Sequence, residues 1–142
     1  MDKKAKLTVA ELERLLSDEF PQMFNPQGGY CIEEVWFGGC RIRKRFSERS
    51  LRPGGTISGT TMMALADFAP YVAILASIGW VPLAVTINLS INFLRKPPAA
   101  DLLAEARLIK LGKRLAVADV GIRSEDDDEL VAHATSTYSI PP

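Results

Sequence analysis

Two periodicities of hydrophobic and polar positions occur along the 142 residues of this chain, one helical and one strand-like. Residues 8–20 open with a capping-box pattern and place leucines on one helical stripe until Pro21 ends the helix. Residues 59–78 are small or apolar on nearly every side, which predicts a longer helix that is buried all round. Ser58 stands where this helix needs its N-cap.

Most other apolar positions follow the period of two that is typical of strands. The clearest case is residues 85–93, which we interpret as a central strand. With a hairpin after Tyr30, we expect six strands and an antiparallel meander among the last four. The last three are expected at residues 102–111, 115–123 and 130–140. Only the long helix is apolar enough to fill the concave face of this sheet.

The sequence therefore predicts an α+β fold in which a curved, six-stranded antiparallel sheet wraps around one long central helix. We expect a single domain, residues 1–142, with residues 1–28 as an N-terminal helical extension. Seventeen basic and seventeen acidic residues cancel, so there is no bulk attraction to nucleic acid or to an anionic membrane, and we expect neither partner. No apolar signal segment follows the basic start, and Cys31 and Cys40 are interpreted as reduced thiols of a cytoplasmic protein.

Asp67 is the single carboxylate inside the long apolar helix. Burying an ionised carboxylate without a partner costs several kcal/mol, and no basic residue lies within a helical turn of it. Such an acid is paired, protonated or kept for chemistry. It shares a helix face with Thr60, Met63 and Tyr71. Two roles stay open at this point, a structural hydrogen bond to a neighbouring strand or second copy, and catalysis.

Three segments, residues 55–67, 85–95 and 110–116, carry a resemblance to a known family. Together they resemble the PaaI-like acyl-CoA thioesterases, over most of the chain from about residue 30 to residue 140. The loop before the helix in that family typically reads Gly-x-x-His-Gly-Gly, with an acid nine residues after the histidine. The resemblance implies the hotdog fold and the hydrolysis of acyl-CoA thioesters.

The spacing places this motif on Gly55, Ser58, Gly59, Thr60 and Asp67. Ser58 thus replaces the histidine, and a family asparagine six residues earlier falls on Arg52. Asp67 is then a general base or a nucleophile, and the free amides of Gly59 and Thr60 at the helix N-terminus form an oxyanion hole. A hydroxyl residue that supports the attacking water in some relatives falls on Thr86. Ser58 is a candidate for catalysis and equally for a simple N-cap.

Coenzyme A carries phosphates that local basic residues have to meet, although loop charges are often merely solvated. The candidate substrate-binding residues are Arg52, Gly55, Met63, Tyr71, Arg95, Lys96, Lys110, Lys113 and Arg114. In relatives the active site lies between two subunits, so the resemblance implies a homodimer or homotetramer. We expect no cofactor and no metal, and no role for the lone His133.

Two alternatives remain. A hotdog protein that binds acyl-CoA or an acyl carrier without turnover is favoured by the replacements at Ser58 and Arg52. A dehydratase of hydroxyacyl thioesters shares the fold but normally needs a histidine near the helix, where this chain has none. We rank the dehydratase last.

Overall fold

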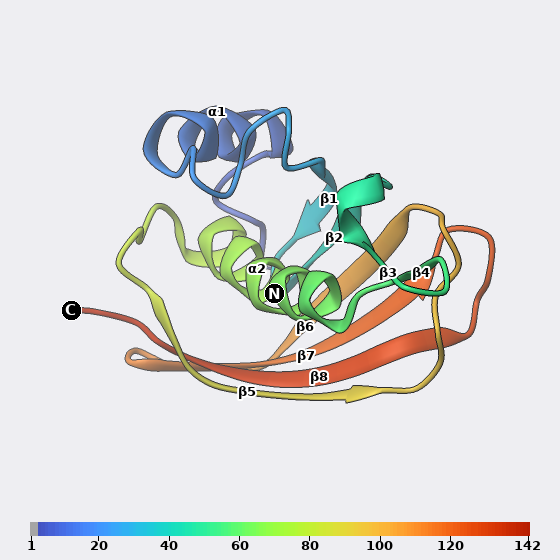
Figure 1. Cartoon of the computed structure of the whole chain (residues 1–142). Coiled ribbons are helices and arrows are strands. Elements are labelled where there is room, and N and C mark those ends of the chain that lie inside the picture. Colours follow the sequence, from blue (N-terminus) through green and yellow to red (C-terminus); the bar gives the residue numbers. More distant parts are fainter. Residues whose placement is uncertain (1–2) are drawn as a thin grey trace.

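The computed structural model describes residues 3–142, and its central feature is a curved six-stranded antiparallel sheet wrapped around the long helix α2, Gly59–Ile78 (Figure 1). The order of strands in the sheet is β1-β2-β6-β7-β8-β5. This confirms the predicted fold class. The strands are β1 Tyr30–Trp36, β2 Gly39–Lys44, β5 Val85–Phe93, β6 Leu102–Leu111, β7 Leu115–Ser124 and β8 Leu130–Ser139. A 3-10 turn, Glu48–Ser50, and a small ladder of β3 Leu51–Arg52 with β4 Thr56–Ile57 lead into α2.

Helix α2 forms the core. Its N-cap is Ser58, as predicted, whose side chain accepts a hydrogen bond from the Thr61 amide at 3.2 Å. The helix ends at Gly79, where φ is +103°. All residues from Phe68 to Ser77 are buried. The helix is long and apolar enough to cross a membrane, but 72% of its most apolar 18-residue window is buried inside the fold. It is the core helix of this domain.

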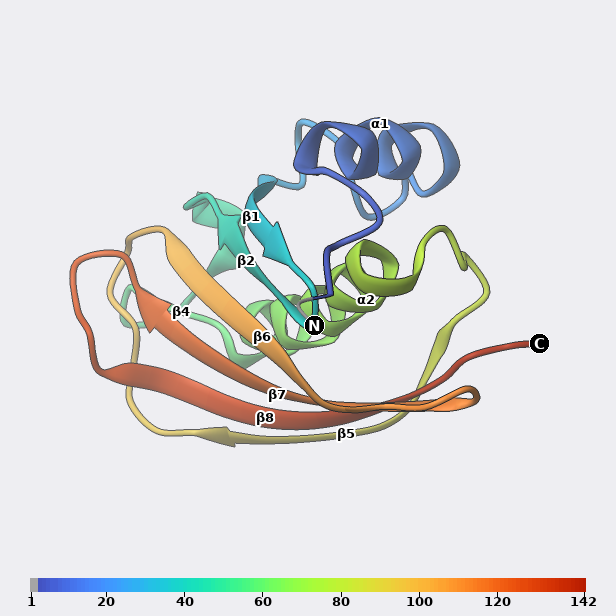
Figure 2. The same ribbon diagram turned by 180° about the vertical axis from the view of Figure 1, so that it is seen from behind.

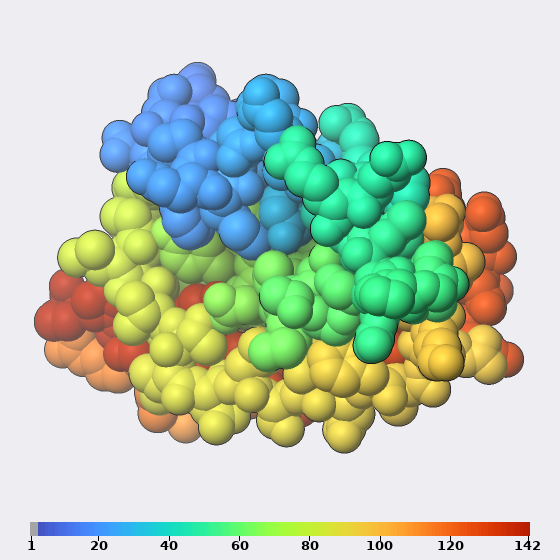
Figure 3. All heavy atoms as spheres, in the orientation of Figure 1, coloured from blue at the N-terminus to red at the C-terminus, as the bar shows by residue number. Residues whose placement is uncertain are grey.

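Two predictions about strand β5 are wrong. It is an edge strand that pairs with β8, whereas we expected a central strand, and only β6, β7 and β8 form a meander. Residues 94–101 carry the chain past β8 and β7 to the start of β6. A period of two shows that one face of a strand is buried, but it does not show which strands lie beside it. The sequence therefore could not decide the place of β5 in the sheet. Figure 3 shows β5 (yellow) along the lower edge of the molecule, where Val85 and Ile87 are more than half exposed.

A bulge in β5 changes which residues face the helix. Thr86 pairs with Tyr138 and Leu89 pairs with Ser136, so β5 uses one residue more than β8 over this stretch, and Ile87 is the extra residue. Directly opposed residues share a face of the sheet. Strict alternation would put Thr86 and Leu89 on opposite faces, but the bulge turns both toward α2.

Helix α1, Val9–Glu19, begins with the predicted capping box and packs on the side of α2 that faces away from the sheet (Figure 2). Leu12 and Leu16 are fully buried. The Lys6 amide donates to the Ala76 carbonyl at 2.7 Å, which ties the segment before α1 to the end of α2. Cys31 and Cys40 lie in neighbouring strands as free thiols.

Candidate active site

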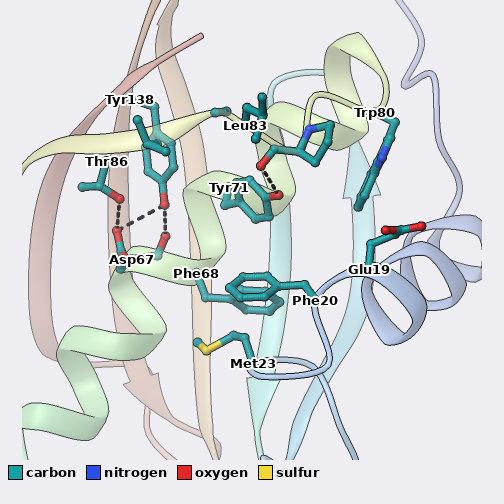
Figure 4. Close-up of a pocket in the computed structure, with 13 residues that line it drawn as sticks. Glu19, Phe20, Met23, Asp67, Phe68, Tyr71, Trp80, Leu83, Thr86 and Tyr138 are labelled. Carbon is teal, nitrogen blue, oxygen red and sulfur yellow. Dashed lines mark hydrogen bonds between the residues drawn. The ribbon is translucent and has the colours of Figure 1, made fainter. Parts of the chain in front are cut away.

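The carboxylate of Asp67 is held by two hydroxyl groups from the sheet (Figure 4). Thr86 Oγ1 donates to Asp67 Oδ1 at 2.5 Å. The Tyr138 hydroxyl lies 2.5 Å from the main-chain oxygen of Asp67 and 3.1 Å from Oδ1. Within residues 3–142, Oδ2 accepts no hydrogen bond and Asp67 makes no ion pair. One carboxylate oxygen is therefore anchored, and the other is available.

Asp67 lines a cavity of about 440 Å³ whose other walls are mainly aromatic and aliphatic. The Phe20 ring, just after α1, packs edge-on against Tyr71 at 6.0 Å between centroids. The Tyr71 hydroxyl donates to the Pro82 carbonyl at 2.9 Å, which turns it away from the carboxylate. Further lining side chains include Met23, Phe68, Trp80 and Leu83. Glu19 is a second carboxylate in this lining (Figure 4). A mainly apolar chamber with a polar corner at Asp67 suits an acyl group whose reacting carbonyl lies at that corner.

The start of α2 faces a second cavity of about 800 Å³, lined among others by Arg52, Gly59, Phe93 and Lys96. The Thr61 amide is used by the N-cap, whereas the Gly59 amide donates no hydrogen bond to any residue from 3 to 142. Within these residues, the Thr60 amide also donates no hydrogen bond. A Cβ on Gly59 would lie 3.3 Å from the Phe93 ring, so glycine lets that ring approach the helix end. Unpaired amides and the positive end of the helix dipole favour a developing negative charge here.

Eight residues separate Gly59 from Asp67 along α2, which is about 12 Å at 1.5 Å per residue. The donors and the acid of one chain are therefore too far apart to contact the same thioester carbonyl. Residues 59–67 form the N-terminal half of α2, and the Gly59 end and the Asp67 end of this segment each carry half of the predicted chemistry.

The other predicted substrate contacts are divided between these ends. The register Thr86–Tyr138–Ala116 places the turn with Lys110, Lys113 and Arg114 at the Asp67 end, where all three are exposed. Arg52 and Lys96 lie at the Gly59 end and, among residues 3–142, neither has an acidic partner within 4.0 Å. Arg95 is also there, but it pairs with Glu129 and, at 3.4 Å, with Asp127.

Some predicted residues lie outside both cavities. Met63 is 43% exposed and lines neither. Gly55 has φ of +79° in the turn before α2, a backbone role that suits glycine. Thr60 is exposed beside Gly59. His133 pairs with Asp119 on the outer face of the sheet and lines neither cavity.

Sequence reasoning missed Tyr138 and the contribution of residues 19–23. Tyr138 ends a series of inward positions that are otherwise small, Ala132, Ala134 and Ser136, and this contrast was an available signal. Burial is the main cause that raises the pKa of Tyr138 above its ordinary value, so the phenol stays a hydrogen-bond donor. Phe20 and Met23 read as ordinary apolar positions, because helix periodicity does not reveal a cavity wall.

Known proteins that are similar to this chain indicate its family. The profile of the thioesterase superfamily matches residues 54–131, more than half of the chain. The chain belongs to the thioesterase superfamily. A protein of Saccharolobus solfataricus, named as an esterase, is 31% identical over 134 residues, covering 94% of this chain and 86% of that one.

Solved structures of other proteins are similar over nearly the whole chain. A Silicibacter protein described as a thioesterase is 45% identical, with a TM-score of 0.87 over 97% of this chain and 94% of that one. The Escherichia coli PaaI protein, from the phenylacetic acid degradation operon, is 21% identical, with a TM-score of 0.79 over 91% and 90% of the two chains. At this low identity, the similarity to PaaI shows a shared fold. Superfamily membership and the thioesterase neighbours support thioester hydrolysis as the general activity.

Proposed function

We propose that this thioesterase-superfamily protein hydrolyses acyl-CoA thioesters at sites shared by two copies of the chain. The observation that carries the proposal is the Asp67 carboxylate, which has one anchored oxygen and one free oxygen and lines an apolar cavity. A carboxylate in this position serves as a general base toward water. Direct attack by Asp67, with a mixed anhydride as intermediate, is the mechanistic rival.

The second copy supplies the missing donors. Strand β5 leaves one edge of the sheet unpaired in the single chain, and its exposed apolar residues include Val85, Ile87 and Phe93. Two-fold pairing of β5 with its own copy is antiparallel. It therefore brings the Thr86 end of one strand beside the Phe93 end of the other. The Asp67 cavity of one chain then meets the Gly59 cavity of its partner.

The reaction uses both halves. The amides of Gly59 and Thr60 donate to the thioester oxygen as negative charge develops there. Asp67 takes a proton from a water whose oxygen attacks the carbonyl carbon, while Thr86 holds Oδ1. Collapse of the tetrahedral intermediate breaks the carbon–sulfur bond, and the leaving thiolate takes up the proton held by Asp67, which restores the carboxylate. The acyl group occupies the aromatic cavity during these steps.

The nucleotide end of coenzyme A needs positive charge near the mouth of the site. Arg52 and Lys96 lie at the Gly59 end and have no acidic partner within the described residues 3–142, and Lys113 and Arg114 lie at the Asp67 end. Across the proposed dimer these two groups flank one composite site. Arg95 contributes less because Asp127 and Glu129 already neutralise it.

A panel of acyl-CoAs with a thiol reagent tests the proposal. We expect release of coenzyme A above the uncatalysed background, and a large loss of this release in Asp67→Asn. Tight binding without release would favour the alternative of a non-catalytic acyl-CoA or acyl-carrier binding protein. That alternative rests on the replacements at Ser58 and Arg52, and Ser58 is the N-cap of α2.

A further inference from the structure

We propose that Tyr138 is a positioning residue that holds the Asp67 carboxylate in the orientation presenting Oδ2 to the apolar cavity. The inference rests on the proposed role of Asp67 in thioester hydrolysis. It adds a residue from the far end of the chain, 71 positions away, that neither the motif nor the composition indicates.

The contacts of Tyr138 differ from those of Thr86. Among the Asp67 oxygens, Thr86 donates to Oδ1, so a carboxylate held by it alone could pivot about that one contact. The Tyr138 hydroxyl reaches the main-chain oxygen of Asp67 at 2.5 Å and Oδ1 at 3.1 Å. Its single hydrogen is shared between these two acceptors in a three-centre bond, which ties the Asp67 side chain to its own backbone and keeps Oδ2 in one direction. Displacement of a reacting group by about 1 Å costs roughly 100-fold in rate, so such a hold has catalytic consequences.

The tyrosine is itself rigid. Its side chain is buried, at 4% exposure, and its ring stacks on Tyr71 at 6.3 Å between centroids. The Tyr71 hydroxyl donates to the Pro82 carbonyl, so it does not compete with Tyr138 for the Asp67 carboxylate. The hydroxyl of Tyr138 is thus presented by a packed ring on a strand interior, which is a firmer support than a loop.

The matched test compares Tyr138→Phe with Tyr30→Phe. Both keep an aromatic ring, but the Tyr30 hydroxyl makes no hydrogen bond within residues 3–142. For Tyr138→Phe we expect kcat to fall about 10- to 100-fold, with KM within about twofold of the parent. Tyr30→Phe is expected to keep the parent kcat. An unchanged kcat, or a rise in KM alone, in Tyr138→Phe would overturn the inference, because a purely structural tyrosine would not affect kcat selectively.

Crystal structures give a readout that does not depend on turnover. The parent is expected to show one Asp67 conformer with the Tyr138 hydroxyl on it, and Tyr138→Phe is expected to show a rotated or split carboxylate. A parent structure with the hydroxyl more than 3.5 Å from Asp67, or an unchanged single conformer in the variant, would overturn the inference. If the parent hydrolysed no thioester, the proposed function would fail separately, and these structures would still decide the role of Tyr138.

Discussion

Residues 59–67, the N-terminal half of helix α2, present opposite chemistry at their two ends. At the Asp67 end, an acceptor is held by two donors inside a cavity with aromatic walls. At the Gly59 end, donors without an acceptor face a larger cavity with basic residues at its rim. Neither end contains both a base and an oxyanion site. This contrast favours the proposal that one chain carries two complementary half-sites rather than one weak site.

Asp67→Asn is expected to have the largest effect on the acid end. Asparagine keeps the size of the side chain but cannot accept a proton from water, so kcat should fall about 10²- to 10⁴-fold. Circular dichroism and sedimentation are expected to show an unchanged fold and assembly. Undiminished hydrolysis by this variant would remove Asp67 from the mechanism.

The donor end is tested by comparing Gly59→Pro with Gly59→Ala. Both substitutions add a Cβ beside Phe93, but only proline removes the backbone N–H donor of residue 59. Proline fits the first helical position, and the extended conformation of Ser58, with ψ of 151°, is compatible with a following proline. We expect kcat of Gly59→Pro to be about 10²- to 10³-fold below that of Gly59→Ala. Equal rates for the two variants would show that this amide does not stabilise the oxyanion.

The wall formed after α1 should control acyl size at the Asp67 end only. Met23→Trp fills part of the 440 Å³ cavity. We expect the ratio of kcat/KM for a small acyl group to that for a bulky one to rise about tenfold. Met23→Leu, which nearly conserves volume, is the control. An unchanged ratio in the tryptophan variant would mean that the acyl group lies elsewhere.

Charge at the Gly59 end is compared in Lys96→Ala and Arg95→Ala. Lys96 has no acidic partner among residues 3–142, whereas Arg95 has two. We expect the lysine variant to raise KM about fivefold at low salt and less at high salt, since phosphate contacts by exposed lysines are screened. The arginine variant should change KM less. The reverse order would assign the phosphate contact to Arg95.

The smallest expected effect is on the free energy of unfolding, at Glu33, which lines neither cavity. Hydrogen bonds from Arg43, and then Arg41, hold the pKa of Glu33 below its ordinary value. The stabilisation is present above the unfolded-state pKa and is lost as pH falls through the folded-state pKa. Glu33→Gln should therefore lower the free energy of unfolding most at neutral pH, and the difference should shrink in acid. Denaturant titrations across pH measure this, and a difference that grows in acid would contradict the assignment.

Local patterns predicted much of the fold. The capping box of α1, the N-cap at Ser58 and the apolar run of α2 each depend on neighbours a few residues away, and all are confirmed. The edge position of β5 was not predictable, because it depends on where residues 94–101 carry the chain. Alternation identifies a strand, whereas neighbours are chosen by the whole sheet.

The candidate site shows the same division. Motif spacing led to Asp67, Gly59 and Thr86, but alternation alone would have turned Thr86 to the face opposite Leu89. The bulge at Ile87 brings it to the acid, and a bulge has no sequence signature here. Tyr138 was missed because its contact joins residues 71 positions apart.

Subunit complementation tests the central claim most directly. Asp67→Asn and Gly59→Pro are each expected to be nearly inactive alone, but a heterodimer of the two contains one composite site with an intact acid and an intact donor. After equal amounts are unfolded and refolded together, random pairing predicts recovery of about a quarter of parental activity. Recovery near that level is the result we expect. Mixed dimers with no activity above the separate variants would contradict a site shared between two chains.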